Sequence, residues 1–323
     1  MTIDYPVYLP LLGSGLLGAG ASVLARRLPP VAAVRLLVFS GVVVAACSCY
    51  VLGTLAFTLL ALFPPIAALG HWSSSVLAAS APVPRMVMIA AAAVLGLIAL
   101  GTLHVIVRRS RELLAARALG LEFGTTPRQL HIVDEDIGVF AVPTAHGGHI
   151  IASRRLLAAL HAPERKAVLA HEAAHLAHHH HGYRLVADLA ATLNPLLRPL
   201  SAAVRFATER WADEVAATAV GDRAVVARAL ARASLHSQSI PPAALRQAAT
   251  LDAAGTAVVE RVEALLRPTP RPQPALMAAV AALLVMTVGC VADAQQDTAQ
   301  TFDHAKAQHA AANSGSSAVP RRS

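Results

Sequence analysis

Four long apolar stretches constrain this chain more than any other feature of its sequence. A helix that crosses a lipid bilayer needs about 20 mostly apolar residues. Each of the four stretches is close to that length or longer, and none contains Asp, Glu, Lys or Arg. The stretches are Tyr5–Ala25, Leu36–Leu62, Met86–Val107 and Ala275–Ala292. The sequence therefore predicts a mainly α-helical integral membrane protein with four transmembrane helices.

The composition agrees with a chain embedded in a membrane. Only 14% of the residues are charged, whereas soluble globular proteins average about 25%. This depletion excludes disorder over most of the chain and argues against a single soluble domain. The net charge of +8 comes almost wholly from arginine, which is typical of membrane flanks. Because only 4% of the residues are aromatic, the chain lacks a platform for stacking bases, and we expect a lipid bilayer rather than nucleic acid as its partner.

The arginines predict the orientation in the membrane, because cytoplasmic loops carry an excess of Lys and Arg. Arginines cluster after the first stretch, after the third and before the fourth, and the loop 63–85 holds only one. The clusters are Arg26, Arg27 and Arg35; Arg108, Arg109, Arg111 and Arg117; and Arg267 and Arg271. We therefore expect a multi-pass protein of the cell membrane, with the segment between the third and fourth helices in the cytoplasm.

This orientation divides the chain into four predicted regions. Residues 1–107 hold three transmembrane helices with short loops, and residues 108–274 form a cytoplasmic domain. Residues 275–292 form the fourth transmembrane helix. Residues 293–323 are polar and rich in Ala, Ser and Gln, which predicts a disordered tail outside the cytoplasm.

The segment between the third and fourth helices combines short strands with helices, which predicts an α+β domain. The apolar runs Val139–Val142 and His149–Ala152 flank Gly147-Gly148 and are typical of a hairpin. Pro143 indicates that the first of these strands lies at a sheet edge or ends there. A further β-rich run is Leu130–Val133, and helices are expected at Tyr183–Leu193, about Leu200–Val220, Arg223–Leu235 and Val258–Leu266.

The residues that carry chemistry are His171-Glu172-Ala173-Ala174-His175. Pro163 is well placed to begin a helix that runs through this motif to at least His179. On a helix, positions i and i+4 differ by about 40° around the axis, so His171 and His175 share one face and can bind one Zn²⁺. Glu172 lies about 100° from His171, where it can serve as the general base without ligating the metal.

A catalytic zinc needs a third protein ligand and leaves one coordination position open. Glu209 and Asp213 lie at i and i+4 on a later predicted helix. Glu209 is the candidate ligand, and Asp213 is placed to accept a hydrogen bond from the other ring nitrogen of a ligand histidine. The alternative is an exposed helix face with an ion pair between Arg210 and Glu214.

The two motifs, His-Glu-Ala-Ala-His and Glu-Arg-Trp-Ala-Asp, resemble those of the integral-membrane gluzincin metallopeptidases. That group includes the HtpX proteases, the CAAX prenyl endopeptidases and the BlaR/MecR type of antibiotic-sensor peptidase. The last is the most similar in its order of three spans, a zinc domain and a fourth span. Weaker similarities lie in the flanking stretches 167–170, 194–197 and 259–266.

This resemblance implies a zincin-like cytoplasmic domain and a role for each motif residue. It implies that His171, His175 and Glu209 bind Zn²⁺, that Glu172 is the catalytic base and that Asp213 orients a ligand. The antibiotic sensors carry a large extracellular penicillin-binding domain after the fourth span, whereas only 293–323 follow it here. Direct sensing of a β-lactam is therefore not expected.

Four consecutive histidines, His178 to His181, follow the motif. If the helix continues, His178 and His179 share the face of His171 and His175. They would then serve as alternative ligands or as a tract that gathers metal. A solvated and partly protonated helix end is the favoured interpretation, because positive charge suits a helix C-terminus. Arg210 or a histidine of this run are candidates for stabilising the oxyanion.

The sequence therefore predicts a zinc-dependent endopeptidase that cuts peptide bonds at the cytoplasmic face of the membrane. The expected substrate is a protein or peptide, either a repressor in a regulatory circuit or a membrane protein. The alternative is a non-proteolytic metal-binding membrane protein, either a sensor or a transporter. The absence of Asp, Glu, Lys and Arg from all four predicted spans argues against transport, since a transport pathway is expected to show such residues.

Overall fold

The structure is a computed structural model, and it describes residues 9–80, 83–123, 129–135, 138–144, 148–238 and 254–316. The N-terminal helices are α1 (Leu9–Arg27), α2 (Pro30–Ala61), α3 (Pro64–Leu69), α4 (Ser74–Ala79) and α5 (Arg85–Phe123). Next come β1 (Leu130–Val133), β2 (Val139–Val142), β3 (His149–Ser153), α6 (Arg154–Ala159), α7 (Ala162–Ala177) and α8 (His180–Leu193). The remaining elements are η2 (Pro195–Leu197), α9 (Arg198–Val220), α10 (Arg223–Gln238), α12 (Ala254–Leu266) and α13 (Pro274–Ser316).

Three helices in the described ranges are long and apolar enough to cross a membrane. Their candidate spans are Pro30–Ala61, Arg85–Arg111 and Pro274–Ala311. They cover the second apolar stretch except Leu62, and the whole of the third and fourth. The first predicted stretch forms α1, which is not among these candidate spans, and its predicted start at Tyr5 lies outside the described residues. Three apolar helices indicate a protein associated with the membrane.

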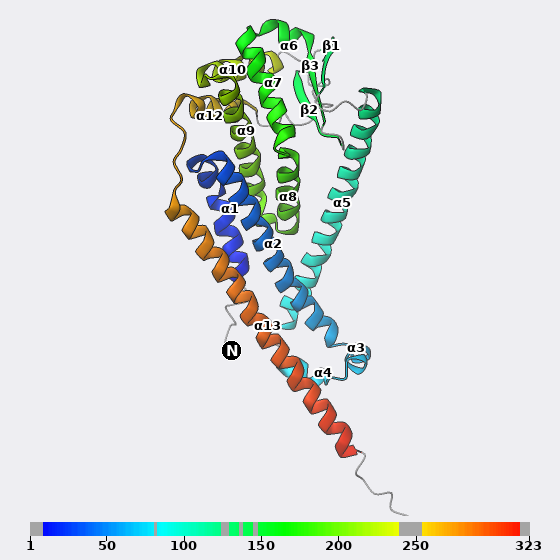
Figure 1. Ribbon diagram of the computed structural model, residues 1–323. Coiled ribbons are helices and arrows are strands. Elements are labelled where there is room, and N and C mark those ends of the chain that lie inside the picture. The colour runs from blue at the N-terminus through cyan, green and yellow to red at the C-terminus, as the bar shows by residue number, and fades with distance from the viewer. Residues whose placement is uncertain are drawn as a thin grey trace, which may run out of the picture.

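The helices α8 and α9 pack against α1 and α2, so the segment 108–274 is not isolated from the N-terminal helices (Figure 1). One hydrophobic core contains residues of α1, α2, η2, α8, α9 and α13, among them Leu28, Val34, Leu197, Leu200 and Val204, all with no exposed surface. At Gly18 an added Cβ would lie 2.3 Å from the Leu196 carbonyl oxygen. The absence of a side chain at Gly18 therefore lets α1 approach η2 closely.

A buried polar contact ties the end of α8 to the same two N-terminal helices. The Asn194 side-chain amide donates hydrogen bonds to the hydroxyls of Ser14, at 2.7 Å, and Ser48, at 2.9 Å. Its own oxygen accepts from the Leu196 amide, which satisfies the backbone at the start of η2. Because Ser14 is in α1 and Ser48 in α2, this amide links three elements in an otherwise apolar region.

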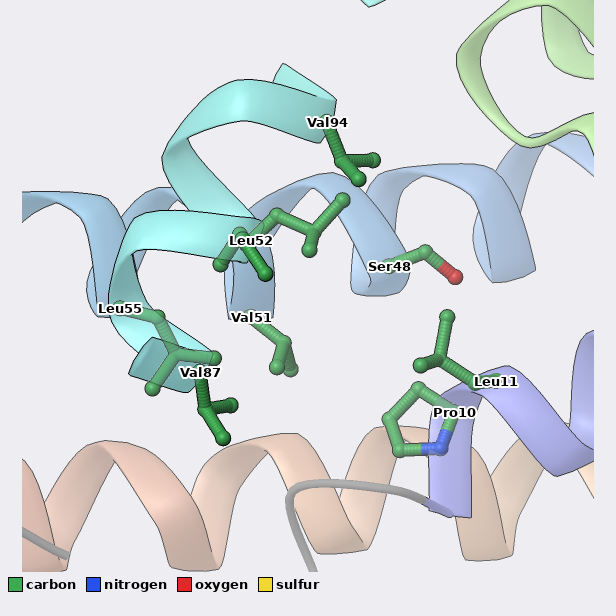
Figure 2. A pocket seen from close by; sticks show the side chains of 10 residues that line it. Pro10, Leu11, Ser48, Val51, Leu52, Leu55, Val87 and Val94 are labelled. Carbon is green, nitrogen blue, oxygen red and sulfur yellow. The ribbon is translucent and has the colours of Figure 1, made fainter. Parts of the chain in front are cut away.

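An apolar cavity lies among α1, α2 and α5 (Figure 2). Its lining includes Leu11, Val51, Leu55 and Val87, with the hydroxyl of Ser48 as its polar side chain. No residue of the two sequence motifs lines it. This cavity therefore offers no acid, base or metal ligand, and the candidate chemistry lies elsewhere.

The described strands form a small sheet in the order β1-β3-β2, with β1 parallel and β2 antiparallel to β3. The predicted hairpin is confirmed, with Ala141 opposite Ile150, and β2 lies at an edge of this sheet, as Pro143 indicates. Gly148 has a φ of +83°, and a Cβ there would lie 2.6 Å from the Val142 carbonyl oxygen. The glycine is thus required by both backbone angle and space.

The helices predicted between the motif and the fourth span are confirmed as α8, α9, α10 and α12, with ends that differ by a few residues. The prediction that the motif helix continues to His179 is wrong, because α7 ends at Ala177. His179 has a left-handed φ of +52°, which stops the helix and lets α8 begin at His180 in a new direction.

The predicted disorder of the C-terminal region is wrong as far as Ser316. The helix α13 continues beyond the apolar stretch to that residue. Between Cys290 and Ser314 the chain has no Gly or Pro and many Ala and Gln residues, which favour a helix. Phe302 also packs edge-on against Trp72, with ring centroids 5.3 Å apart. Local propensity and this aromatic contact together hold the segment in a helix.

Candidate metal centre

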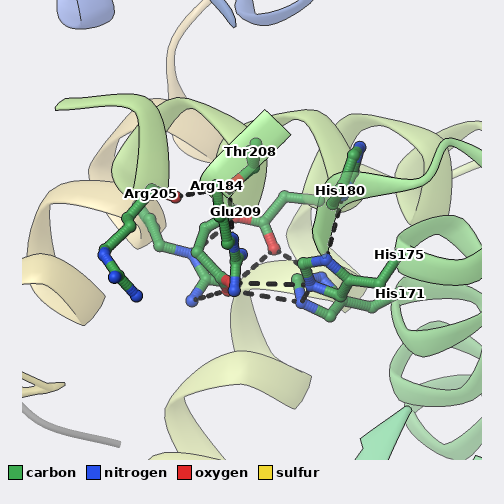
Figure 3. A network of polar contacts seen from close by, with 9 residues as sticks. His171, His175, His180, Arg184, Arg205, Thr208 and Glu209 are labelled. Carbon is green, nitrogen blue, oxygen red and sulfur yellow. Dashed lines mark hydrogen bonds and ion pairs between the residues drawn. The ribbon is translucent and has the colours of Figure 1, made fainter. Parts of the chain in front are cut away.

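Two histidines from α7 and one glutamate from α9 converge on a common point (Figure 3). The Nε2 atoms of His171 and His175 are 3.1 Å apart. The Glu209 carboxylate oxygens lie 3.4 Å from the Nε2 atom of His171 and 3.5 Å from that of His175. These ligand atoms all lie within 4.8 Å of one another. Two imidazole nitrogens and one carboxylate form a donor set that suits a catalytic Zn²⁺ with one open position.

The two helices can bring these side chains together because small residues lie where they pack. Ala167 and Ala174 are buried on α7, and Ala212 and Ala216 are buried on α9. Short side chains allow close approach of the helix backbones. The ligands of one helix then face those of the other, as the i and i+4 spacing on each helix predicts.

Asp213 lies one helical turn after Glu209 and contacts the candidate ligand His171. Its Oδ1 atom is 3.0 Å from the Nδ1 atom of His171, and its side chain is almost fully buried. The contact leaves Nε2 of His171 facing Glu209 and His175. This is the arrangement in which a carboxylate fixes the orientation of a ligand imidazole.

Arg261 of α12 contacts the candidate metal centre, and motif analysis of the sequence misses it. Its guanidinium donates to both oxygens of Asp213, at 2.8 and 2.7 Å, and lies 2.8 Å from a Glu209 oxygen. Arg261 is also nearly buried, which makes this pairing strong. The only sequence signal was its place in the flanking stretch 259–266.

Arg184 of α8 is a second arginine that motif analysis misses. It donates to the other Glu209 oxygen and, at 2.9 Å, to the Thr208 hydroxyl (Figure 3). Glu209 therefore has one arginine on each carboxylate oxygen. Burial opposes ionisation of Glu209, but the charge of Arg261 and the nearby histidines outweigh it and hold its pKa well below the usual range. The carboxylate is thus ionised and able to ligate a cation.

The two candidate histidine ligands differ in their electrostatics. Burial opposes protonation of His171, but hydrogen bonds to Asp213 and Glu209 outweigh it and raise its pKa to about 10. Burial lowers the pKa of His175 well below its usual value. His175 is therefore neutral, whereas a metal must displace a proton from His171. Such competition makes metal binding depend on pH.

Glu172 lies outside the group of three ligands, between α7 and the edge strand β2. Its carboxylate accepts a hydrogen bond from the backbone N–H of Ala141. Burial raises its pKa to about 7, against the opposing charge of His171. A carboxyl group with a pKa near neutrality can both take and return a proton at physiological pH.

The histidine run does not form the solvated, protonated helix end that was the favoured interpretation. His179 and His181 are exposed, but His180 has no exposed surface. Its Nδ1 atom lies 2.9 Å from Nδ1 of His175. Burial and the charge of Arg184 lower the pKa of His180 to about 3, so this ring is neutral. That expectation is therefore wrong for His180.

The structure places Arg210 away from the candidate ligands. Its guanidinium donates to the carbonyl oxygens of Ala25, at 2.6 Å, and Arg26, at 3.3 Å, and so satisfies the C-terminal end of α1. It is nearly buried, and Glu214 pairs instead with Arg223 at 2.8 Å. These contacts contradict both the oxyanion candidate and the alternative of an exposed Arg210–Glu214 pair.

Comparison with known proteins assigns the segment that holds this centre. Residues 108–271, about half of the chain, match the sequence pattern that defines peptidase family M48. No curated protein and no solved structure matches the chain significantly. The matched segment contains both sequence motifs, the sheet, and the two arginines that hold Glu209. The chain belongs to peptidase family M48, whose members are metallopeptidases.

Proposed function

We propose that this protein is a zinc-dependent endopeptidase of the cell membrane. The observation that carries the proposal is the convergence of His171, His175 and Glu209, with Glu172 beside them, within the segment that matches a metallopeptidase family. Two nitrogen ligands and one carboxylate oxygen favour zinc over the oxygen-preferring Mg²⁺ and Ca²⁺. The proposed similarity to the antibiotic-sensor subtype rests on the order of the apolar helices and on the two motifs.

The roles of the surrounding residues follow from their positions. Bound zinc would polarise the substrate carbonyl and lower the pKa of a water molecule. Glu172 takes the proton of the attacking water and returns it to the leaving amine, for which a pKa near neutrality is suitable. Arg261 keeps Asp213 and Glu209 ionised and in place. Asp213 orients His171.

The edge strand β2 is the proposed place for an extended substrate. Its partner strand β3 occupies one side of it, and Ala141 in its centre contacts the proposed base Glu172. A peptide that pairs with the other side of β2 would gain backbone hydrogen bonds and lie beside the base. A protein or peptide substrate, such as a repressor or a membrane protein, would pair with β2 through a flexible segment that can become extended.

The purified full-length chain in detergent tests this function directly. We expect about one zinc per chain by native mass spectrometry, as the one-metal donor set predicts. We also expect cleavage of an unfolded protein substrate at its internal peptide bonds. Chelation should remove both metal and activity, and added zinc should restore both. Zinc-loaded protein that cleaves no unfolded substrate would instead favour a non-proteolytic metal-binding protein.

The proposed orientation places the metal centre at the cytoplasmic face, because the arginine clusters lie on that side. Reporter fusions at Ser75 and Ser316 are expected to read as outside, and a fusion at Ser239 as inside. A fusion at the loop between α1 and α2, such as at Pro29, is the control and should also read as inside. A cytoplasmic signal at Ser75 would contradict the orientation and the assignment of residues 108–274 to the cytoplasm.

A further inference from the structure

His180 is enclosed among aromatic rings directly behind the metal ligands. It has no exposed surface. Its ring lies against Trp211, with centroids 4.8 Å apart, and His178 stacks at 5.9 Å. The left-handed backbone of His179 directs the first residue of α8 inward. A polar side chain is thus placed in a buried position by a backbone conformation that costs energy in a residue other than glycine.

The contact with His175 assigns the protons of both rings. His175 directs Nε2 toward Glu209 and His171, and a ligand nitrogen must carry a lone pair. With a metal on Nε2, the proton of His175 would be on Nδ1, and that N–H would donate to Nδ1 of His180, which lies 2.9 Å away. His180 then carries its own proton on Nε2.

This assignment leaves a polar atom of His180 without a conventional partner. Its Nε2 atom is buried and has no hydrogen-bond partner in the described part of the chain. An unpaired buried donor is unfavourable, so an apolar ring would fill this site at lower cost. Packing therefore does not account for a histidine here, whereas the hydrogen bond from His175 does.

We propose that His180 is a positioning residue that accepts the Nδ1 proton of the ligand His175 and so orients its Nε2 toward the metal. This inference rests on the proposed metal centre. The two candidate histidine ligands then differ in their supports, since His171 donates to the carboxylate of Asp213 and His175 to the imidazole of His180.

Substitutions that separate shape from hydrogen bonding test the proposal. His180→Phe keeps an aromatic ring beside Trp211 but removes the acceptor, and His180→Asn places an amide oxygen near the position of Nδ1. We expect zinc affinity, measured by chelator competition on the full-length chain, to fall about 10–100-fold in the Phe variant. The Asn variant should recover most of the wild-type zinc affinity. Visible absorption of the Co²⁺-substituted protein should change in the Phe variant and return in the Asn variant.

The matched control is His178→Phe, because His178 stacks on Trp211 and on His180 but is not one of the three residues whose ligand atoms converge. It should bind zinc as the wild type does. If His180→Phe does not fold, judged by thermal unfolding, His180→Ala serves as the variant without an acceptor. Unchanged affinity without an acceptor, or equal losses in the folded Phe and Asn variants, would overturn the proposal. A wild-type chain that binds no zinc would overturn the metal centre itself, and the two failures are therefore distinguishable.

Discussion

Glu172→Gln is expected to eliminate measurable proteolysis while the protein retains its zinc. The amide keeps the size of the carboxyl group but cannot take a proton from water, and loss of a general base typically costs about 10²–10⁴-fold in rate. Zinc stays because Glu172 is not among the three residues whose ligand atoms converge. Cleavage of an unfolded protein and metal content are measured on the same preparation.

The control for this substitution is Glu263→Gln, at an exposed glutamate paired with Arg267. A pair of this kind contributes little to stability, so both activity and zinc should remain.

The pH profile of proteolysis provides a second test of the role of Glu172. Because burial raises the pKa of Glu172 to about 7, the base is protonated and inactive below that pH, and activity should rise with pH. The charge of bound zinc would lower this midpoint. Loss of zinc from Glu172→Gln, or continued cleavage, would show that Glu172 is not the base.

Glu209→Ala is expected to lose zinc almost completely, and activity with it. The substitution removes one of three ligands and leaves two histidines, too few for a catalytic zinc site. It also leaves Arg184 and Arg261 without the carboxylate between them, so their positive charges repel a cation. Zinc content after dialysis against a weak chelator measures the effect. Glu214→Ala is the control, because Glu214 is on the same helix but pairs with Arg223.

Asp213→Asn is expected to lie between the wild type and Glu209→Ala. The amide keeps the shape of Asp213 but weakens the acceptor for His171 and the pairing with Arg261. Loss of such a support typically lowers metal affinity or activity about 10–100-fold. Added zinc should therefore partly restore activity in Asp213→Asn but not in Glu209→Ala. Equal zinc content in the wild type and Glu209→Ala would remove Glu209 from the metal site.

Much of the local structure of this protein follows from short-range patterns in its sequence. Three candidate spans are visible because their apolar stretches need no partner to be recognised. The C-terminal ends of α8, α9 and α12 follow from turn residues and apolar periodicity. His171, His175, Glu209 and Asp213 are recognisable because i and i+4 spacing on a helix places side chains on one face. All of these signals act over a few residues along the chain.

Other features depend on contacts between segments far apart in the sequence, which no local pattern records. Arg184 and Arg261 have no motif of their own, and they contact Glu209 only because α8 and α12 pack beside α9. Arg210 lies in a motif but contacts the end of α1 instead of the metal centre. The sequence predicts His180 on a solvated helix end, whereas the left-handed turn at His179 directs it inward to His175. Sequence determined the candidate ligands and their spacing, whereas tertiary packing decided which charges and hydrogen bonds support them, because those interactions depend on helix-to-helix distances rather than on positions along one helix.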